Sequence, residues 1–188
     1  MAIKLLAIAK EVNGKVELRV HPTMIPKKHP LANVYDSYNA VFIKGNAVGD
    51  LMFYGKGAGD LPTGSAIVSD IVSIVRSNVD TENPNPVVKN NLWKREILDM
   101  GSVESKFYIR ATVLDESGVL GEITAILGKH QVSIRSVIQK GDEEEGQVTI
   151  VLVTHRTNEA KIDEAIKEIK ELKSVNKIEN IIRIEDFK

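Results

Sequence analysis

The pattern of apolar and polar positions divides the chain into two halves of different character. In the second half, residues 105–188, stretches rich in β-branched residues alternate with stretches whose apolar residues recur at helical spacing. Two predicted helices begin near Val119 and after Asn158, and four predicted strands cover residues 107–114, 132–140, 147–155 and 175–184. The order β-α-β-β-α-β is that of a ferredoxin-like fold, in which both helices cover one face of an antiparallel four-stranded sheet.

The first half, residues 1–79, has the pattern of short strands separated by turns. Ile3–Lys10 and Lys15–Val20 both alternate between apolar and polar residues, and Asn13-Gly14 between them is a strong signal for a tight hairpin. The chain is expected to stay extended over His21–Pro26, because residues before proline disfavour helix. Further along, the pattern predicts a short helical turn at 30–34, strands at 39–44 and 50–54, and a helix at 66–77.

A polar segment rich in asparagine and proline, residues 80–104, separates the halves and has no sustained helical or strand period. We therefore predict three parts: a domain portion at 1–79, a linker at 80–104 and a second domain at 105–188. The predicted fold class is α+β, with a partial mixed or antiparallel sheet region followed by the ferredoxin-like domain.

Composition and charge narrow the range of functions. The chain has 188 residues, of which 43% are hydrophobic, so it can form one or two folded domains. With 25 Lys and Arg against 26 Asp and Glu, and 5% aromatic residues, no nucleic-acid partner is expected. It has no cysteine and four scattered histidines, so no metal site is expected. No apolar run approaches the roughly 20 residues that cross a membrane, and no signal peptide is evident, which predicts a cytoplasmic protein without a membrane partner.

The turn after the first strand of the second half is a candidate binding site. Gly118 allows a positive φ, and the helix that follows presents unpaired N–H groups that suit a carboxylate. Asp115, three residues earlier, is placed to bind an ammonium group, so the turn suits an α-amino acid. The alternative is a plain capping turn in which Asp115 or Ser117 caps the helix, and the local chemistry alone favours that alternative.

The run Asp115-x-x-Gly118-Val119-Leu120-Gly121, followed by His130–Gln139 and embedded in this element order, resembles an ACT domain. ACT domains bind amino acids and regulate metabolic enzymes, and they usually pair side by side, which implies a homodimer or a higher oligomer. In that family the ligand lies between this first turn and the second strand of a neighbouring copy. The resemblance therefore implies an amino-acid effector bound by Asp115, Gly118, Val119, Leu120 and Gly121, with Ile138 and Gln139 added from the second strand.

A glycine-rich loop, Gly55-x-Gly57-x-Gly59, precedes the predicted helix of the first half. A strand, a glycine loop and a helix in this order can hold an anion, but the spacing is not that of a dinucleotide fingerprint. Close packing of the loop against another part of the protein is an equal alternative. The longer runs from His21 to Val34 and from Gly49 to Ala66 resemble the C-terminal portion of the catalytic region of homoserine dehydrogenase.

This second resemblance implies a family that interconverts homoserine and aspartate semialdehyde with NAD(P). The Rossmann domain and the catalytic residues of that family have no counterpart here, so we assign no catalytic residue and expect no cofactor to bind this chain alone. Gly57 and Gly59 are expected to lie near the nicotinamide end of a cofactor held by another domain. The chain is then a truncated, split or freestanding piece, and a chain that supplies the N-terminal domain is a candidate partner.

Two functional hypotheses fit these features. In the first, the chain is the C-terminal and regulatory portion of homoserine dehydrogenase, and its ACT domain gives feedback control with threonine as the favoured effector. In the second, it is an autonomous ACT-type amino-acid sensor without catalytic activity. An RNA-binding ferredoxin-like domain is disfavoured, because the strands lack the paired aromatic residues and the basic stripe of RNA readers.

Overall fold

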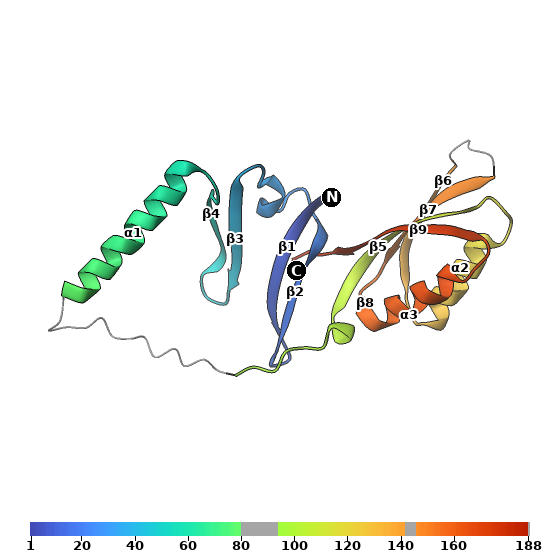
Figure 1. Ribbon diagram of the computed structural model, residues 1–188. Coiled ribbons are helices and arrows are strands. Elements are labelled where there is room, and N and C mark those ends of the chain that lie inside the picture. Colours follow the sequence, from blue (N-terminus) through green and yellow to red (C-terminus); the bar gives the residue numbers. More distant parts are fainter. Residues whose placement is uncertain (80–93, 142–145, 188) are drawn as a thin grey trace. The chain divides into compact units, whose positions relative to one another are not determined.

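The computed structural model describes residues 1–79, 94–141 and 146–187 (Figure 1). Contacts group the chain into a first unit, residues 1–27 with 95–188, and a second unit, residues 28–94. The domain boundaries predicted at residues 79 and 105 rest on sequence character, whereas these units reflect contacts. The difference between the two divisions arises because the first hairpin joins the second half of the chain.

The second half has the predicted ferredoxin-like topology. Its strands lie in the order β9-β5-β7-β6, and every neighbouring pair is antiparallel. A two-residue strand, β8 (Thr157–Asn158), pairs with the start of β5. The main elements are β5 (Glu104–Leu114), α2 (Val119–Lys129), β6 (Ile134–Gly141), β7 (Gln147–Thr154), α3 (Glu159–Lys170) and β9 (Val175–Ile184).

A single apolar core lies between this sheet and its two helices. Alternate residues of β5, among them Phe107, Ile109 and Val113, are buried, as expected where only one face of a sheet is covered. Ile123 of α2 and Ile162 of α3 close the core from the helix side. Each such side chain contributes about 1.5–3 kcal/mol when it is fully buried, so this core is the main source of stability in the second half.

The first hairpin consists of β1 (Ala2–Val12) and β2 (Lys15–Ile25). Asn13 and Gly14 both have positive φ, 51° and 79°, so the predicted tight turn is confirmed. β2 runs longer than predicted and ends beside β9, where Thr23 and Met24 pair in parallel with the last residues of that strand. The hairpin therefore extends the ferredoxin-like sheet at its β9 edge (Figure 1).

Part of the predicted linker is paired with this hairpin. Residues 80–93 lie outside the described residues, as do residues 142–145 of the predicted loop between the second and third strands of the second half. Beyond them, the Val16 N–H donates to the carbonyl of Glu96, and the Leu98 N–H donates to the carbonyl of Val16, both at 2.8 Å. A 3-10 turn, η2 (Met100–Ser102), then leads into β5.

The second unit holds the remaining elements. The predicted turn, strands and helix are present as η1 (Pro30–Asn33), β3 (Tyr38–Gly45), β4 (Gly49–Lys56) and α1 (Asp60–Val79). The predicted start of this helix, Ala66, is wrong by six residues, since the helix begins at Asp60. α1 can begin at Asp60 because a helix tolerates a proline such as Pro62 in its first turn. The backbone N–H that proline lacks would have no hydrogen-bond partner within the helix at that position. No described helix is both long and apolar enough to span a membrane.

Candidate functional site

The turn between β5 and α2 has the backbone geometry that the glycine pattern predicted. Gly118 is the N-cap residue of α2, with φ 99° and ψ −20°, a conformation that side-chain-bearing residues rarely adopt. Because the cap residue has no side chain, α2 has no side-chain cap, and the alternative in which Asp115 or Ser117 caps the helix is wrong. The amide of Asp115 instead donates to the carbonyl of Gly146, 3.0 Å away, which ties the turn to the start of β7.

The first turn of α2 leaves two backbone donors available. The Glu122 N–H donates to the carbonyl of Gly118 at 3.0 Å, and the Val119 N–H makes a long contact of 3.5 Å with the carbonyl of Glu116. Among the residues that the structure describes, the N–H groups of Leu120 and Gly121 have no hydrogen-bond partner. Two adjacent free amides at the positive end of a helix form a local binding point for a carboxylate.

The predicted effector residues of this turn differ in what their side chains offer. Asp115, Gly118 and Gly121 are exposed, whereas Val119 is buried in the core and Leu120 is half-buried against it. Val119 can therefore contribute only its backbone to a ligand. An open hollow of about 460 Å³ lies beside the turn, lined by Leu114, Glu116, Glu122, Glu171, Leu172, Lys173 and Ser174.

The hollow adds acidic groups that sequence reasoning did not single out. Glu116 and Glu122 come from the turn and from α2, and Glu171 faces them from the end of α3. The hydroxyl of Ser174 donates to Glu122 at 2.8 Å, which orients one of these carboxylates. Three carboxylates against one lysine make the surroundings of the turn attractive to an ammonium group.

The predicted second-strand residues lie apart from the turn within one chain. Ile138 pairs with Val151 and Gln139 with Ile150, so the two side chains point to opposite faces of the sheet. Ile138 stands roughly 16 Å from Leu114, four residues along the strands and two strands across. Both residues are exposed on β6, which is the outermost strand of the sheet on that side.

The glycine-rich loop of the second unit is closely packed at one of its glycines. A Cβ atom at Gly57 would lie 1.7 Å from the side-chain nitrogen of Asn39, so the absence of a side chain makes room for that amide. Gly59 has φ 126° and leads directly into α1. Asp60 stands in the first turn of that helix and places a carboxylate where a phosphate would bind. A negative charge in the first turn makes this helix start less favourable for a phosphate group.

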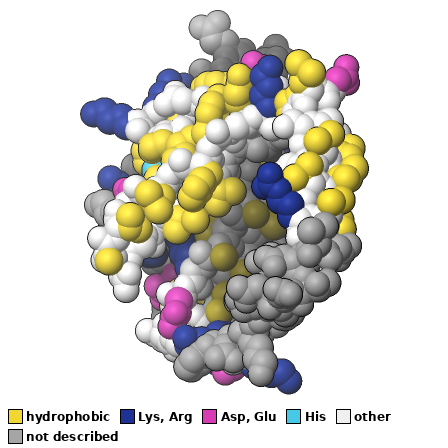
Figure 2. Space-filling model, turned by 90° about the vertical axis from the view of Figure 1, so that its left-hand side faces the viewer, with side chains coloured by type: hydrophobic (Ala, Val, Ile, Leu, Met, Phe, Trp, Pro, Cys, Tyr) yellow, Lys and Arg dark blue, Asp and Glu magenta, His cyan; other side chains and the backbone are white. Residues whose placement is uncertain are grey.

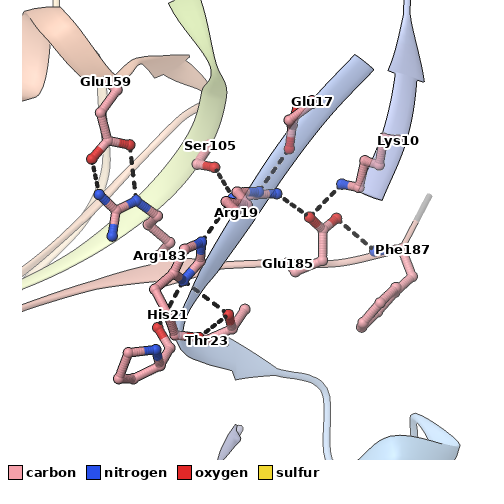
Figure 3. A network of polar contacts seen from close by, with 11 residues as sticks. Lys10, Glu17, Arg19, His21, Thr23, Ser105, Glu159, Arg183, Glu185 and Phe187 are labelled. Atoms are coloured by element: carbon pink, nitrogen blue, oxygen red, sulfur yellow. Dashed lines mark hydrogen bonds and ion pairs between the residues drawn. The ribbon is translucent and has the colours of Figure 1, made fainter. Parts of the chain in front are cut away.

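A cluster of buried and half-buried charged and polar side chains, which we call the hairpin cluster, links the first hairpin to the ferredoxin-like half (Figure 3). The Arg19 guanidinium lies at its centre, 2.7 Å from a Glu185 carboxylate oxygen and 2.8 Å from the Ser105 hydroxyl. Nothing in the sequence alone signals this cluster, since its members come from five separate elements or segments. They are Lys10, Glu17, Arg19, His21, Thr23, Ser105, Glu159, Arg183 and Glu185.

Two groups of the hairpin cluster have shifted pKa values. Burial lowers the pKa of His21, and the nearby positive charges of Arg183 and Arg19 lower it further against an opposing hydrogen bond to the Pro22 carbonyl. Burial raises the pKa of Glu185, but the hydrogen bond and charge of Lys10 and the charge of Arg19 outweigh it, so the net shift is downward. The cluster therefore favours a neutral imidazole beside an ionised carboxylate.

Comparison with known proteins assigns both halves of the chain. The family model for homoserine dehydrogenase matches residues 1–72, and the model for the ACT domain matches residues 107–174. A homoserine dehydrogenase of Neisseria gonorrhoeae is 41% identical over 98% of this chain, and one of Pseudomonas aeruginosa is 39% identical over 98%. The chain spans 43% and 44% of the lengths of these two relatives.

Solved structures agree with this assignment. The homoserine dehydrogenase of Thiobacillus denitrificans is 40% identical and has a TM-score of 0.85, over 98% of this chain and 42% of that one. The homoserine dehydrogenase of S. aureus at pH 7.0 is 30% identical with a TM-score of 0.57, over 97% and 41%. Fold and matches together define a segment similar to part of homoserine dehydrogenases, followed by a ferredoxin-like ACT domain. Residues 1–72 are similar to homoserine dehydrogenases and residues 107–174 to ACT domains, in the order in which they match a single stretch of such enzymes.

Proposed function

We propose that this chain serves NAD(P)-dependent interconversion of homoserine and aspartate semialdehyde, together with the catalytic and cofactor-binding parts of a homoserine dehydrogenase. The observation that carries the proposal is the match over nearly the whole chain to such enzymes, in the order of catalytic segment and ACT domain. No catalytic residue is assigned among the 188 residues. Their role is to complete the catalytic region and to regulate it.

Exposed apolar surface supports a role within a larger assembly. The outer face of the first hairpin carries Leu5 and Val20, which are 73% and 70% exposed. In the second unit, a series of apolar residues of α1 is exposed. Figure 2 shows hydrophobic side chains on the face of the molecule that lies to the left in Figure 1. Large exposed apolar patches mark interaction sites. We infer that the N-terminal part of a homoserine dehydrogenase, or a further copy of this chain, covers them.

Complementation tests this assignment. The 188 residues alone should not reduce NADP with homoserine, and adding the part of the T. denitrificans enzyme that precedes the matched region should restore the activity. The added part alone is the control. Homoserine-dependent reduction of NADP by the 188 residues alone would contradict the proposal.

Gly57 and Gly59 stay predicted contacts to the nicotinamide end of a cofactor whose phosphates are held elsewhere. No step of the reaction is assigned to the loop. Gly59, where a Cβ atom would meet Pro62 no closer than 3.4 Å, leaves room for another group to approach, whereas the space beside Gly57 is taken by the Asn39 amide.

We further propose that the turn between β5 and α2 binds an amino-acid effector, with threonine the first candidate. The free amides of Leu120 and Gly121 would hold the carboxylate, and Asp115 with the nearby glutamates would hold the ammonium group. Ile138 and Gln139 are too far from the turn of their own chain to contact the same ligand. Their participation requires the outer strand β6 of a second copy, so this site rests on a homodimer or a higher oligomer.

Substitution of Asp115 tests the effector site. Asp115→Ala should weaken threonine binding, measured by calorimetry, by about 1.5–3 kcal/mol, because a charge-assisted hydrogen bond is lost. Asp163→Ala, at an exposed aspartate of α3, is the matched control and should bind threonine as the unchanged chain does. Unchanged affinity in Asp115→Ala would place the site elsewhere, and absence of heat with threonine, homoserine, methionine, lysine or isoleucine would count against effector binding.

A further inference from the structure

The first hairpin buries its charged face and exposes its apolar face. Along β2, the buried residues are Glu17, Arg19, His21, Thr23 and, at its end, Ile25, and the exposed residues that alternate with the first four are Leu18, Val20 and Pro22. Charged side chains are costly to bury unless each finds a partner. Glu17 is paired with Arg19 of the same strand, and the other partners of Arg19 come from the ferredoxin-like half.

Those partners converge on Arg19. One nitrogen of its guanidinium donates to Glu185, just after β9, and another donates to Ser105 of β5. The side chains of Arg19 and Glu185 are 2% and 4% exposed, so water cannot replace either group for the other. Lys10 of β1 also donates to Glu185, so one carboxylate holds both strands of the hairpin.

Backbone contacts and a second ion pair continue this link. The Glu185 N–H donates to the carbonyl of Met24 at 3.0 Å, directly after the parallel pairing of β2 with β9. Arg183 of β9 forms a two-point ion pair with Glu159 at the start of α3, with one bond of 2.9 Å. Two groups of polar contacts therefore lie along this junction: one joins β2 to the end of β9 through Arg19 and Glu185, and the other joins β9 to the first turn of α3 through Arg183 and Glu159 (Figure 3).

We propose that Arg19 and Glu185 form a buried latch through which the end of β9 holds β2, so that the ACT domain and the first hairpin of the dehydrogenase segment open and close together. A displacement of β9 or α3 is then transmitted to the catalytic segment through the sheet rather than through the linker. The latch itself rests on the contacts above. Its use in regulation rests on the effector binding proposed for the turn between β5 and α2.

The energetic reason is the burial of the charges. Removing the Glu185 charge takes away a buried partner of both Arg19 and Lys10 and leaves Glu17, 2.7 Å from Arg19, as the remaining acidic partner of that guanidinium among the described residues. This loss is more damaging than losing an exposed ion pair, because water does not replace the missing charge. Glu185→Gln should therefore make it easier for β2 to separate from β9. Because β2 and β9 share the buried face, the amides of both strands should become exposed in the same opening event.

Hydrogen exchange of the full chain, followed by mass spectrometry, tests the latch without any ligand. In Glu185→Gln, exchange should rise roughly tenfold or more over β2 and over β9 together, by similar factors. Glu96→Gln is the matched control, since Glu96 makes an exposed ion pair with Lys15 at the turn of the same hairpin, and it should leave both strands unchanged. Faster exchange in β2 alone, or in neither strand, would overturn the proposal.

A milder variant covers the case in which Glu185→Gln does not fold. Arg19→Lys keeps the charge but loses the planar group that bonds Glu185 and Ser105 at once, and it should raise exchange in the same two strands to a smaller extent. Unchanged exchange in a folded Arg19→Lys chain counts against the latch.

Threonine provides the regulatory arm of the test. If effector binding and the latch both hold, threonine slows exchange at residues 115–121 and also in β2, and Arg19→Lys removes the second effect but keeps the first. Protection of the turn without protection of β2 in the unchanged chain overturns the regulatory use of the latch. Absence of protection at the turn refutes effector binding alone, since the latch is decided by the measurements without ligand.

Discussion

Gly118, in the turn between β5 and α2, and Gly121, in the first turn of α2, should respond to substitution by alanine in opposite directions. Gly118 has φ 99°, whereas Gly121 lies inside α2 with ordinary helical backbone, and a Cβ atom at either position meets no atom within 4 Å. Steric crowding is therefore absent at both positions. The difference between Gly118→Ala and Gly121→Ala reports the backbone conformation alone.

The magnitudes follow from that conformation. Alanine in a left-handed conformation costs about 1–2 kcal/mol, and the reduced freedom of the unfolded chain returns about 0.4–1 kcal/mol of this. Gly118→Ala should thus lower the free energy of unfolding by about 1 kcal/mol. Gly121→Ala should raise it by up to about 1 kcal/mol, because alanine is the better helix former.

Urea unfolding followed by far-ultraviolet circular dichroism measures both variants against the unchanged chain. Threonine calorimetry on the same samples adds a functional comparison, because the methyl group of Gly121→Ala would stand beside the two free amides and should weaken binding although the fold is more stable. A Gly118→Ala chain as stable as the unchanged one would refute the left-handed turn. Full threonine affinity in Gly121→Ala would refute the placement of the carboxylate.

Two further outcomes are expected. The pKa of His21 is lowered from 6.5 in the folded chain, so the unfolded chain takes up a proton first as the pH falls. The stability that the neutral ring provides is complete above about pH 6.5 and is lost as the pH falls from there through the lowered pKa. Urea midpoints should therefore fall more with decreasing pH in the unchanged chain than in His21→Gln, and equal losses in the two chains would contradict the lowered pKa. Gly57→Ala should displace the Asn39 amide, whose exposed side chain can turn away, and should lower the melting temperature only slightly. A large loss that Asn39→Ala restores would contradict this and show that the Asn39 side chain is held in place.

Local sequence rules were sufficient for most secondary structure and for the second-half topology. The Asn13-Gly14 pair specified its hairpin because both residues tolerate positive φ, and the spacing of apolar residues placed α2 and α3 because their apolar stripes must face one sheet. The start of α1 was missed, since a loop rich in glycine and proline can also contain the first turn of a helix.

The candidate site was predictable only in part. The glycine pattern indicated the turn and its free amides, because a residue with positive φ before a helix is a local property. It did not show that Val119 is buried or that Ile138 and Gln139 face opposite sides of β6, since both depend on the register and on what packs against each face. The carboxylates of the hollow come from the turn, α2 and the end of α3, which only the fold brings together.

The sequence by itself determined the two resemblances, their order and the local turns, because these depend on residue types at short spacing. Only the tertiary structure decided that the first hairpin belongs with the ACT domain. Arg19 and Glu185 are 166 positions apart, and each alone has the character of an ordinary exposed charge. They become buried partners because β2 and β9 pair in parallel, a long-range contact that no local pattern encodes.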